Sequence, residues 1–334
     1  MPKPEAIAGG DKPSVAAALN LIEDRRPEAQ QRIEALLREL LTVGAAAAGQ
    51  RIGLTGPPGV GKSTLTAALS RGMRGRGLSV GVVAVDPSSV RSGGALLGDR
   101  ARMAFDPGDD GLFVRSLATA GDPGGLAYAV PAAVEVLAAA YDRVIVETTG
   151  VGQTETDVEH VADTVVLVIQ PGSGDVLQFI KAGIMEIPDV VVVNKGDHGA
   201  LAQRAASDLT GALDTLRGVG VGDGAGAGGS TWQVPVLVTS ARDRTGIEPL
   251  LDALDGHRGA IGTVLTERRR AGAAAWALEL LARRYGDHGL ETMGGRASVV
   301  SAIAKLFSDG SAPLEAVRVL GQRYLAQLRT SGGA

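Results

Sequence analysis

A glycine-rich segment near the first strongly apolar run carries the clearest chemical signal of the chain. Residues 56–63 read GPPGVGKS and match the pattern G-x-x-x-x-G-K-[ST]. Glycines at this spacing let backbone N–H groups converge on phosphate oxygens, and a following helix adds its positive N-terminal end. We expect Lys62 to reach the β- and γ-phosphates of a nucleotide and the Ser63 hydroxyl to ligate Mg²⁺. The predicted nucleotide-binding residues here are Gly56, Pro57, Pro58, Gly59, Val60, Gly61, Lys62, Ser63 and Thr64.

A second motif indicates which base the nucleotide carries. Residues 194–197 read NKGD, follow the apolar run 190–193 and match N-K-x-D. The Asp197 carboxylate can accept two hydrogen bonds from guanine, whereas adenine presents neither donor there and would leave a charged acceptor unpaired. A short Ser-Ala turn follows the apolar run 234–238, where a backbone contact to the base carbonyl is expected. The predicted base-binding residues are Asn194, Lys195, Asp197, Ser240 and Ala241.

Three carboxylates at or after the ends of apolar runs are candidate metal ligands. Glu147 begins the sequence ETTG, where many P-loop GTPases carry D-x-x-G. A carboxylate there can hold Mg²⁺ through water, and the Gly150 amide can meet the γ-phosphate. Asp86 ends an apolar run, and Asp99 follows a glycine-rich loop, so that both can approach the metal. The predicted metal ligands are Ser63, Asp86, Asp99 and Glu147, and the predicted catalytic residues are Lys62, Asp99, Glu147, Gly150 and Lys181.

Three further side chains have open roles. Lys181 could reach the phosphates or a partner, or could be a solvated cation on a helix. Arg115 could be a phosphate clamp or a structural ion pair, and Gln153 is a weak candidate for orienting the attacking water. Because neither a built-in arginine finger nor a Ras-like glutamine is evident, we expect slow intrinsic hydrolysis that a partner accelerates.

The elements that must position these residues follow an alternating pattern. Short runs that are apolar throughout, separated by helical stretches, are typical of a parallel sheet covered by helices on both faces. The sequence therefore predicts an α/β protein with the P-loop NTPase fold. The predicted strands are 51–55, 80–85, 143–147, 164–169, 190–193 and 234–238, and the predicted helices among them include 63–74 and 125–140.

Composition narrows the possible partners. The formal net charge is −4 and aromatic residues make up only 3% of the 334 residues, which argues against nucleic-acid binding. No apolar run approaches the ~20 residues of a membrane helix, and the N-terminal residues lack the apolar core of a secretory signal. We therefore expect a cytoplasmic protein without a membrane partner. The absence of cysteine excludes disulfides, thiolate metal sites and cysteine nucleophiles.

These motifs together resemble the MeaB/ArgK family of P-loop GTPases, the methylmalonyl-CoA mutase-associated GTPases. The likeness extends over about residues 14–330. The segments that carry it are GPPGVGKST (56–64), AVDPSS (84–89), GDRARM (98–103), FVRSLA (113–118), ETTGVGQTE (147–155), residues 170–183 and NKGD (194–197). Two segments depart from the family pattern: the residues from Thr119 onward and the glycine-rich stretch 218–230.

The resemblance implies hydrolysis of GTP to GDP and phosphate, with Mg²⁺ surrounded by Ser63, Asp86, Asp99 and Glu147. It implies that Lys181 belongs to a mobile segment that responds to a partner. It further implies that the protein is a GTP-dependent chaperone for an adenosylcobalamin-dependent methylmalonyl-CoA mutase, and that a C-terminal helical arm makes a homodimer.

The predicted organisation has four parts. They are a disordered tail (1–12), an N-terminal helical extension (13–47) broken near Pro27, a P-loop GTPase domain (48–256) with a flexible insertion (218–230), and a C-terminal helical dimerisation arm (257–334). We expect helices over 259–284, 296–306 and 312–329 in the arm. A lone arm could not bury its apolar stripes on the central domain, which favours a dimer. Packing within the same chain is the alternative. The stripes consist of Trp276, Leu280, Leu281, Val299, Ile303 and Leu306.

Three alternative functions remain open from the sequence. The same phosphate-binding loop could serve an ATPase or kinase linked to arginine and ornithine transport, although the motif at 194–197 argues against adenine. The protein could be a non-enzymatic scaffold whose partner affinity is switched by a nucleotide. A nickel-delivery GTPase is a weaker alternative, because the chain has no cysteine and its four histidines show no ligand spacing.

Overall fold

The structure of the protein is a computed structural model. It describes residues 1–43, 49–86, 105, 108–118, 129–148, 157–172, 188–218 and 232–331. Four residues that the sequence singles out lie outside the described residues, namely Asp99, Gly150, Gln153 and Lys181. Asp86 is described at the level of its backbone alone, and almost all of the predicted insertion at 218–230 lies outside as well.

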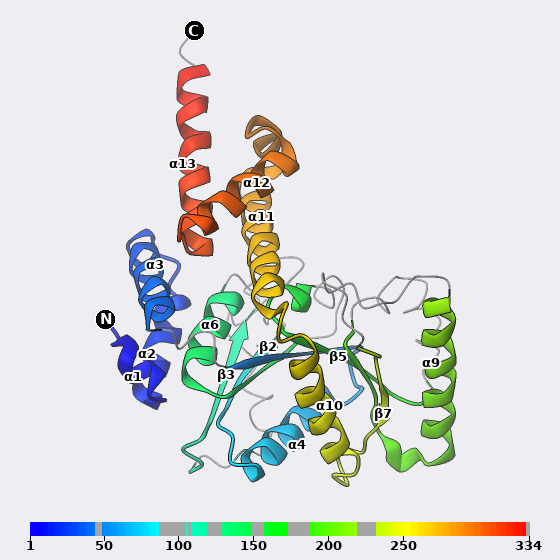
Figure 1. The fold of residues 1–334 in the computed structure, drawn as a ribbon. Coiled ribbons are helices and arrows are strands. Elements are labelled where there is room, and N and C mark those ends of the chain that lie inside the picture. Colours follow the sequence, from blue (N-terminus) through cyan, green and yellow to red (C-terminus); the bar gives the residue numbers. More distant parts are fainter. Residues whose placement is uncertain are drawn as a thin grey trace, which may run out of the picture.

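A parallel sheet of seven strands forms the centre of the molecule, in the order β3-β2-β4-β1-β5-β6-β7 (Figure 1). The strands are β1 (Gln50–Thr55), β2 (Val80–Asp86), β3 (Leu112–Ala118), β4 (Arg143–Glu147), β5 (Thr164–Ile169), β6 (Val190–Val193) and β7 (Val236–Val238). Five predicted strands are confirmed to within one residue. The prediction at 234–238 is too long by two residues, and β3 is not among the predicted strands.

Helices cover both faces of the sheet, as the apolar strands predict. The helices of this domain are α4 (Lys62–Gly75), α6 (Val130–Ala140), α9 (Ala200–Gly218) and α10 (Ile247–Ala260). On one face, Ile52 and Leu54 of β1 pack with α4 and α10. On the opposite face, Val144 and Val146 of β4 pack with α6, and α9 covers β6 and β7. This arrangement confirms the predicted α/β fold.

The N-terminal residues are ordered, so the predicted disordered tail is wrong. The extension consists of α1 (Pro4–Ala8), α2 (Lys12–Ile22) and α3 (Pro27–Thr42), which lie beside α6 (Figure 1). Pro4 and Pro27 each occupy the first turn of a helix, where a missing N–H costs nothing. Ile7 is fully buried in the core that α6 contributes to. A single apolar side chain in a polar stretch therefore holds α1 in place.

The C-terminal helices differ from the expected boundaries. The predicted helix 259–284 is two helices, because α10 ends at Ala260 and α11 (Leu265–Thr292) begins after a turn that contains Gly262. Within α11 the backbone leaves helical geometry at Gly286, where φ is 67°. α12 (Gly295–Ser308) and α13 (Pro313–Ser331) follow. Helices α11, α12 and α13, here called the arm, extend away from the sheet (Figure 1). None of the helices that the structure describes is both long and apolar enough to span a membrane.

The apolar stripes of the arm are covered within one chain, which corrects the argument for a dimer. Leu281 and Ile303 are fully buried, and Leu280 and Val299 are nearly so. Trp276 and Leu306 are half-buried against the same core. The three arm helices pack on one another and α11 packs on the short helix η2 (Val158–His160). The homodimer that the family resemblance implies therefore stays a prediction without support from these side chains.

Two buried carboxylates attach the base of the arm to the sheet. Asp163, at the start of β5, is 1% exposed and accepts hydrogen bonds from Arg269 Nε and Nη2 at 2.7 and 2.6 Å and from the backbone N–H of Arg51. Gly272 lies so close to η2 that a Cβ there would be 2.3 Å from the carbonyl oxygen of His160. The arm therefore contacts the sheet domain through charge and through close backbone packing.

Asp189 is the second carboxylate of this attachment. It accepts hydrogen bonds from Arg268 Nη1 and Nη2 at 3.1 and 2.7 Å and lies 3.2 Å from His257 Nε2. Burial alone would raise the pKa of Asp189, but the hydrogen bond from His257 and the charge of Arg268 outweigh burial, and the pKa lies below its ordinary value. The ionised Asp189 therefore contributes to the free energy of unfolding at pH values above about 3.9, the pKa of an unfolded aspartate. This contribution is lost as the pH falls from there through the lower pKa of Asp189 in the folded protein.

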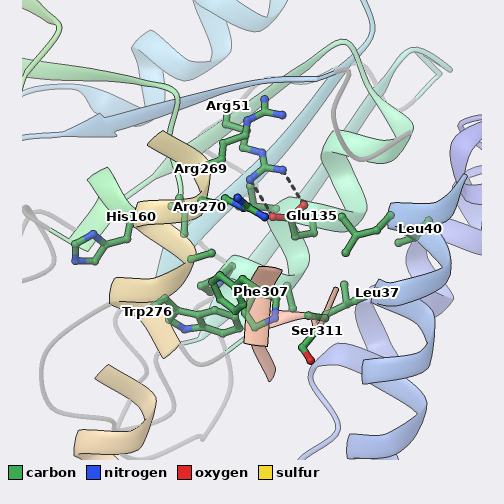
Figure 2. Close-up of a pocket in the computed structure, with 18 of the residues that line it drawn as sticks. Leu37, Leu40, Arg51, Glu135, His160, Arg269, Arg270, Trp276, Phe307 and Ser311 are labelled. Atoms are coloured by element: carbon green, nitrogen blue, oxygen red, sulfur yellow. Dashed lines mark hydrogen bonds and ion pairs between the residues drawn. The ribbon is translucent and has the colours of Figure 1, made fainter. Parts of the chain in front are cut away.

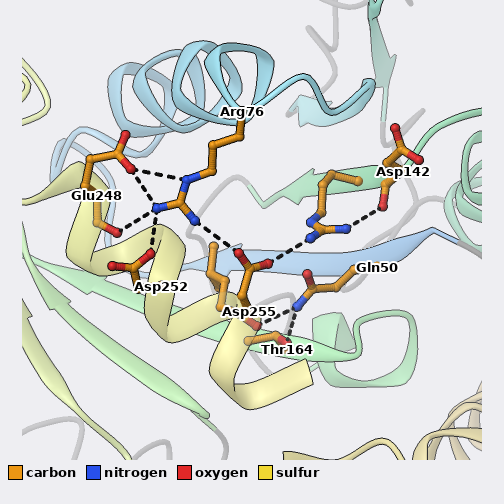
Figure 3. A network of polar contacts seen from close by, with 9 residues as sticks. Gln50, Arg76, Asp142, Thr164, Glu248, Asp252 and Asp255 are labelled. Carbon is orange, nitrogen blue, oxygen red and sulfur yellow. Dashed lines mark hydrogen bonds and ion pairs between the residues drawn. The ribbon is translucent and has the colours of Figure 1, made fainter. Parts of the chain in front are cut away.

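A more exposed network joins the end of α4 to α10 (Figure 3). Arg76, which follows α4, pairs with Glu248 and Asp252 at 2.6 Å each and with Asp255 at 3.1 Å. Asp255 also pairs with Arg143 at 2.8 Å. Pairs at this exposure contribute little individually, but the shared guanidinium fixes how α10 packs beside the helix that follows the phosphate-binding loop.

Replacing Arg269 should destabilise the protein far more than replacing its neighbour. Arg269→Ala leaves a buried carboxylate with one backbone partner, and we expect the free energy of unfolding to fall by about 3 kcal/mol. Arg270 is exposed and forms no ion pair with any described residue, so Arg270→Ala should change the free energy of unfolding by less than about 0.5 kcal/mol. Urea unfolding followed by circular dichroism measures both, and equal effects would contradict the role of Asp163.

Candidate functional site

Those predicted functional residues that the structure describes gather at the carboxyl-terminal edge of the sheet. In the parallel register, Glu147 at the end of β4 pairs with Leu54 of β1 on one side and with Ala84 of β2 on the other. Asp86 is the last residue of β2, two positions beyond Ala84. The loops after β1, β6 and β7 leave from the same edge. Ligands of open parallel sheets bind at this edge, so the topology itself places the motifs together.

The loop at 56–61 needs its glycines for two separate reasons. Gly56, Gly59 and Gly61 have φ values of 137°, 80° and 93°, which side chains rarely adopt. At Gly56 a Cβ would also lie 2.0 Å from the carbonyl oxygen of Val168, and at Gly61 it would lie 2.6 Å from Asn194 Nδ2. The loop therefore presents backbone rather than side chains, as the sequence pattern predicts.

Lys62 begins α4 and folds back over this loop. Its Nζ donates hydrogen bonds to the carbonyl oxygens of Gly56 and Pro57 at 2.7 and 3.0 Å, and the residue is 6% exposed. These two carbonyl oxygens hold the ammonium over the loop. The positive charge therefore lies within the curve of the loop, beside the backbone N–H groups that begin α4.

Glu147 is held by two hydroxyl groups of α4. Ser63 Oγ donates to Glu147 Oε1 at 2.5 Å, and Thr66 Oγ1 donates to Oε2 at 2.8 Å. Glu147 is 5% exposed and Thr66 is fully buried. Thr66 is not among the residues predicted from the sequence, although its position one helical turn after Ser63 places both hydroxyls on one face of α4. Because the Ser63 hydrogen is directed at Glu147, the lone pairs of the hydroxyl remain available to a cation.

Asn194 connects the loop after β1 to the loops after β6 and β7. Its Nδ2 donates to the carbonyl oxygen of Val60 at 2.8 Å, and its Oδ1 accepts from the backbone N–H of Ala241 and from Thr239 Oγ1, both at 3.2 Å. Asn194 is 2% exposed. One buried amide thus fixes the relative position of three loops, and we call it the Asn194 bridge.

The remaining residues of the NKGD motif differ in exposure. Lys195 has a left-handed backbone, with φ of 60°, and its Nζ donates to Gln170 Oε1 at 2.5 Å. Asp197 is exposed, and its Oδ1 accepts a hydrogen bond from Ser240 Oγ at 3.1 Å. Ser240 is 1% exposed and also donates to Asp243 Oδ2 at 3.2 Å. The Asp197 carboxylate therefore faces solvent from a loop that a buried serine supports.

The remaining candidate site residues are Arg115, which the structure describes, and four residues that lie outside the described part of the chain. Arg115 lies on β3 and pairs with Glu23 and with Asn20 Oδ1 of the N-terminal extension, which is the structural ion pair expected as one of its two roles. No group of three or more histidine, aspartate or glutamate side chains in the described part of the chain is placed to hold a metal ion. The positions of Asp99, Gly150, Gln153 and Lys181 relative to the loop stay predictions.

The fold and the site together define the class of protein. A parallel sheet with a phosphate-binding loop between β1 and α4, a carboxylate at the end of β4 and an N-K-x-D motif after β6 is a P-loop GTPase. The chain belongs to the MeaB family: a match to the family described as methylmalonyl Co-A mutase-associated GTPase MeaB extends over residues 15–293. This confirms the resemblance inferred from the motifs.

Individual relatives agree with the family assignment. A protein of Pyrococcus abyssi named as a GTPase is 43% identical over 256 residues, which cover 76% of this chain and 74% of that protein. GTPase ArgK of Escherichia coli is 38% identical over 253 residues, 73% of this chain and 72% of its own. The mouse mitochondrial protein named methylmalonic aciduria type A homolog is 31% identical over 295 residues, 84% of this chain and 69% of its own.

Among solved structures, a crystal structure of an LAO/AO transport system kinase matches with a TM-score of 0.64 and 27% sequence identity, covering 96% of this chain and 95% of its own. The fold is therefore shared along nearly the whole length of both chains. The names of the relatives confirm a GTPase, and the alternative of an ATPase or kinase linked to arginine and ornithine transport is not favoured.

Thr66 provides a test of how Glu147 is held. Thr66→Val keeps the shape of the side chain but removes one of the two hydroxyl donors, so that the carboxylate and the Ser63 hydroxyl are less fixed. We expect the affinity for Mg²⁺ in the presence of GDP to fall five- to tenfold, the loss expected for one buried hydrogen bond to a charged group. Release of fluorescent GDP at different Mg²⁺ concentrations measures it.

Thr66→Ser is the matched control, because it restores the hydroxyl and should restore the Mg²⁺ affinity. An unchanged Mg²⁺ dependence in Thr66→Val would mean that Thr66 only packs beside Glu147.

Proposed function

We propose that this protein is a Mg²⁺-dependent GTPase that acts in the cytoplasm as a nucleotide-gated chaperone of an adenosylcobalamin-dependent methylmalonyl-CoA mutase. The Asn194 bridge is the observation that carries the nucleotide assignment. It joins Val60 of the phosphate-binding loop to Ala241 beside the NKGD motif. The phosphates and the base of one guanine nucleotide would therefore be bound at a fixed separation.

At the phosphate end, the proposed role of Lys62 is to neutralise charge on the β- and γ-phosphates, with backbone N–H groups of the loop as further donors. The Ser63 hydroxyl and the Glu147 carboxylate are hard oxygen ligands of the type that Mg²⁺ prefers, so the residues present suit this ion. When bound, Mg²⁺ would neutralise charge that develops on the phosphates. Ser63 and Glu147 would hold it, with Asp86 and Asp99 as further proposed ligands.

At the base end, the proposed role of the Asp197 carboxylate is to accept hydrogen bonds from the ring N–H and the amino group of guanine. Ser240 supports this carboxylate, and Lys195 is held by Gln170. Opposite adenine the Asp197 carboxylate would lose both hydrogen bonds and remain unpaired. The free-energy cost of this unpaired charge is what selects guanine over adenine. Hydrolysis is the attack of water on the γ-phosphate, and we propose that it is slow until a partner accelerates it.

The partner assignment is supported by names and not by geometry. The family is described as mutase-associated, and one relative is named for methylmalonic aciduria. We propose that the nucleotide state controls the affinity for the mutase. The alternative, a scaffold that binds nucleotide without needing hydrolysis, predicts the same nucleotide site and differs only in what turnover achieves.

Changing the acceptor at position 197 should change the base that is bound. Asp197→Asn replaces a carboxylate that accepts two hydrogen bonds by an amide that accepts one and donates one, so the affinity for GDP should fall about 100-fold. Xanthosine diphosphate has a carbonyl in place of the amino group of guanine, so it should bind the variant better than it binds the wild type. Titration calorimetry measures both nucleotides. Asp243→Asn is the matched control, because Asp243 shares the Ser240 hydroxyl but lies outside the motif. A variant that keeps its guanine preference would contradict the role of Asp197.

The mutase role requires that binding to the enzyme depends on the nucleotide. With purified adenosylcobalamin-dependent methylmalonyl-CoA mutase immobilised on a sensor, we expect at least a fivefold difference in affinity between GDP and a non-hydrolysable GTP analogue. Lys62→Ala should lose nucleotide binding and this difference together. Equal affinities in the two nucleotide states, or no binding to the mutase in either state, would contradict the proposal.

A further inference from the structure

A pocket of about 310 Å³ lies where the N-terminal extension, the sheet domain and the arm meet (Figure 2). Its walls come from α3, the start of α6, η2, α11 and the turn between α12 and α13. This volume lies at the lower end of the range for small-molecule sites in proteins. The apolar side chains that line it include Leu37, Leu40, Leu41, Pro131, Trp276 and Phe307.

Three arginines also line this junction pocket, and two of them are paired. Arg51 donates to both carboxylate oxygens of Glu135, at 2.9 and 2.7 Å, and Arg269 pairs with Asp163. Arg270 is exposed and makes no ion pair or hydrogen bond with any other residue in the described part of the chain. The pocket therefore combines a mostly apolar wall with one positive charge at its rim that the described side chains do not neutralise.

We infer that the junction pocket binds a small amphiphilic monoanion, an acyl or aryl carboxylate whose apolar body enters the pocket and whose carboxylate pairs with Arg270. A planar carboxylate matches the two parallel donors of a guanidinium, and one unpaired cation balances one negative charge. At ~30 Å³ per non-hydrogen atom, the volume that water takes in the liquid, the pocket holds roughly ten such atoms.

This site is separate from the nucleotide site, since none of its lining residues belongs to the phosphate-binding loop or to the NKGD motif. A ligand there would touch the extension through Leu37, the sheet domain through Pro131 and the arm through Trp276. It would therefore add contacts between the arm and the rest of the chain beside the Arg269–Asp163 pair. Binding should stabilise this junction, because it is present only when all three parts are assembled.

Octanoate is the probe, because its chain of eight carbons ends in one carboxylate. The neutral counterpart is 1-octanol, which has the same number of carbons and no charge. The chain has two tryptophans, and Trp276 lines the pocket while Trp232 packs against His257. In Trp232→Phe, with folding checked by circular dichroism and by GDP binding, Trp276 is the sole reporter. We expect saturable quenching or a blue shift of its emission with octanoate, at a concentration at least fivefold below that needed with 1-octanol.

Arg270→Gln should weaken octanoate binding about tenfold, the loss expected for one charge-assisted pair, and leave 1-octanol unchanged. Arg284→Gln is the matched control, since Arg284 lies on the same helix and does not line the pocket. Ala273→Phe fills the pocket and should abolish binding of both probes. Calorimetry with octanoate on the wild-type chain repeats the measurement in case a tryptophan variant does not fold.

Four results would overturn the inference. They are no saturable response to octanoate, equal affinity for octanoate in the wild type and in Arg270→Gln, a folded Ala273→Phe variant that still binds, and light scattering that shows a second copy of the chain displaced by octanoate. The last result would assign the pocket to contact between copies. GDP binding is measured on the same samples, so a failed pocket and a failed nucleotide site give different results.

Discussion

A single buried amide holds the functional edge of this protein together. Asn194 bonds to the carbonyl of Val60 and to the N–H of Ala241, and it sits against Gly61, where no Cβ could be accommodated. Leaving these buried backbone groups without a partner would cost about 1–3 kcal/mol each. The loop that surrounds Lys62 and the loop that carries Asp197 are therefore one rigid unit, which is what a site for a nucleotide with two specific ends requires.

The arm is attached to the same sheet at a different place. Asp163 and Asp189 lie at the amino-terminal ends of β5 and β6, opposite the edge that carries the NKGD motif, and each takes a bidentate arginine from the start of α11. The short helix η2 connects the two regions along the chain, because it follows the segment that begins at Glu147 and contacts α11 at Gly272.

The central strands and the motifs were predictable from the sequence, and the edges were not. β6 is apolar throughout, and β4 and β5 have continuous buried apolar residues at 144–146 and 165–169, so their pattern is clear. By contrast, β3 is an edge strand with half-buried Arg115 and Ser116. Order in α1 depends on burying Ile7 in a core shared with α6, which no local pattern reveals. The burial of the apolar stripes of the arm likewise depends on how α11, α12 and α13 pack together. The role of Thr66 is visible only once the fold brings α4 beside Glu147 at the end of β4.

The most direct measurement is a crystal structure of the protein with GDP and Mg²⁺. We expect the β-phosphate to lie within hydrogen-bond distance of Lys62 Nζ and of backbone N–H groups in the loop 56–63. We also expect the guanine ring N–H and amino group to lie within hydrogen-bond distance of the Asp197 carboxylate, with the Asn194 bridge intact. Electron density that leaves this pocket empty, or that places the base away from Asp197, would show that the motifs at 56–63 and 194–197 do not form one guanine-nucleotide site.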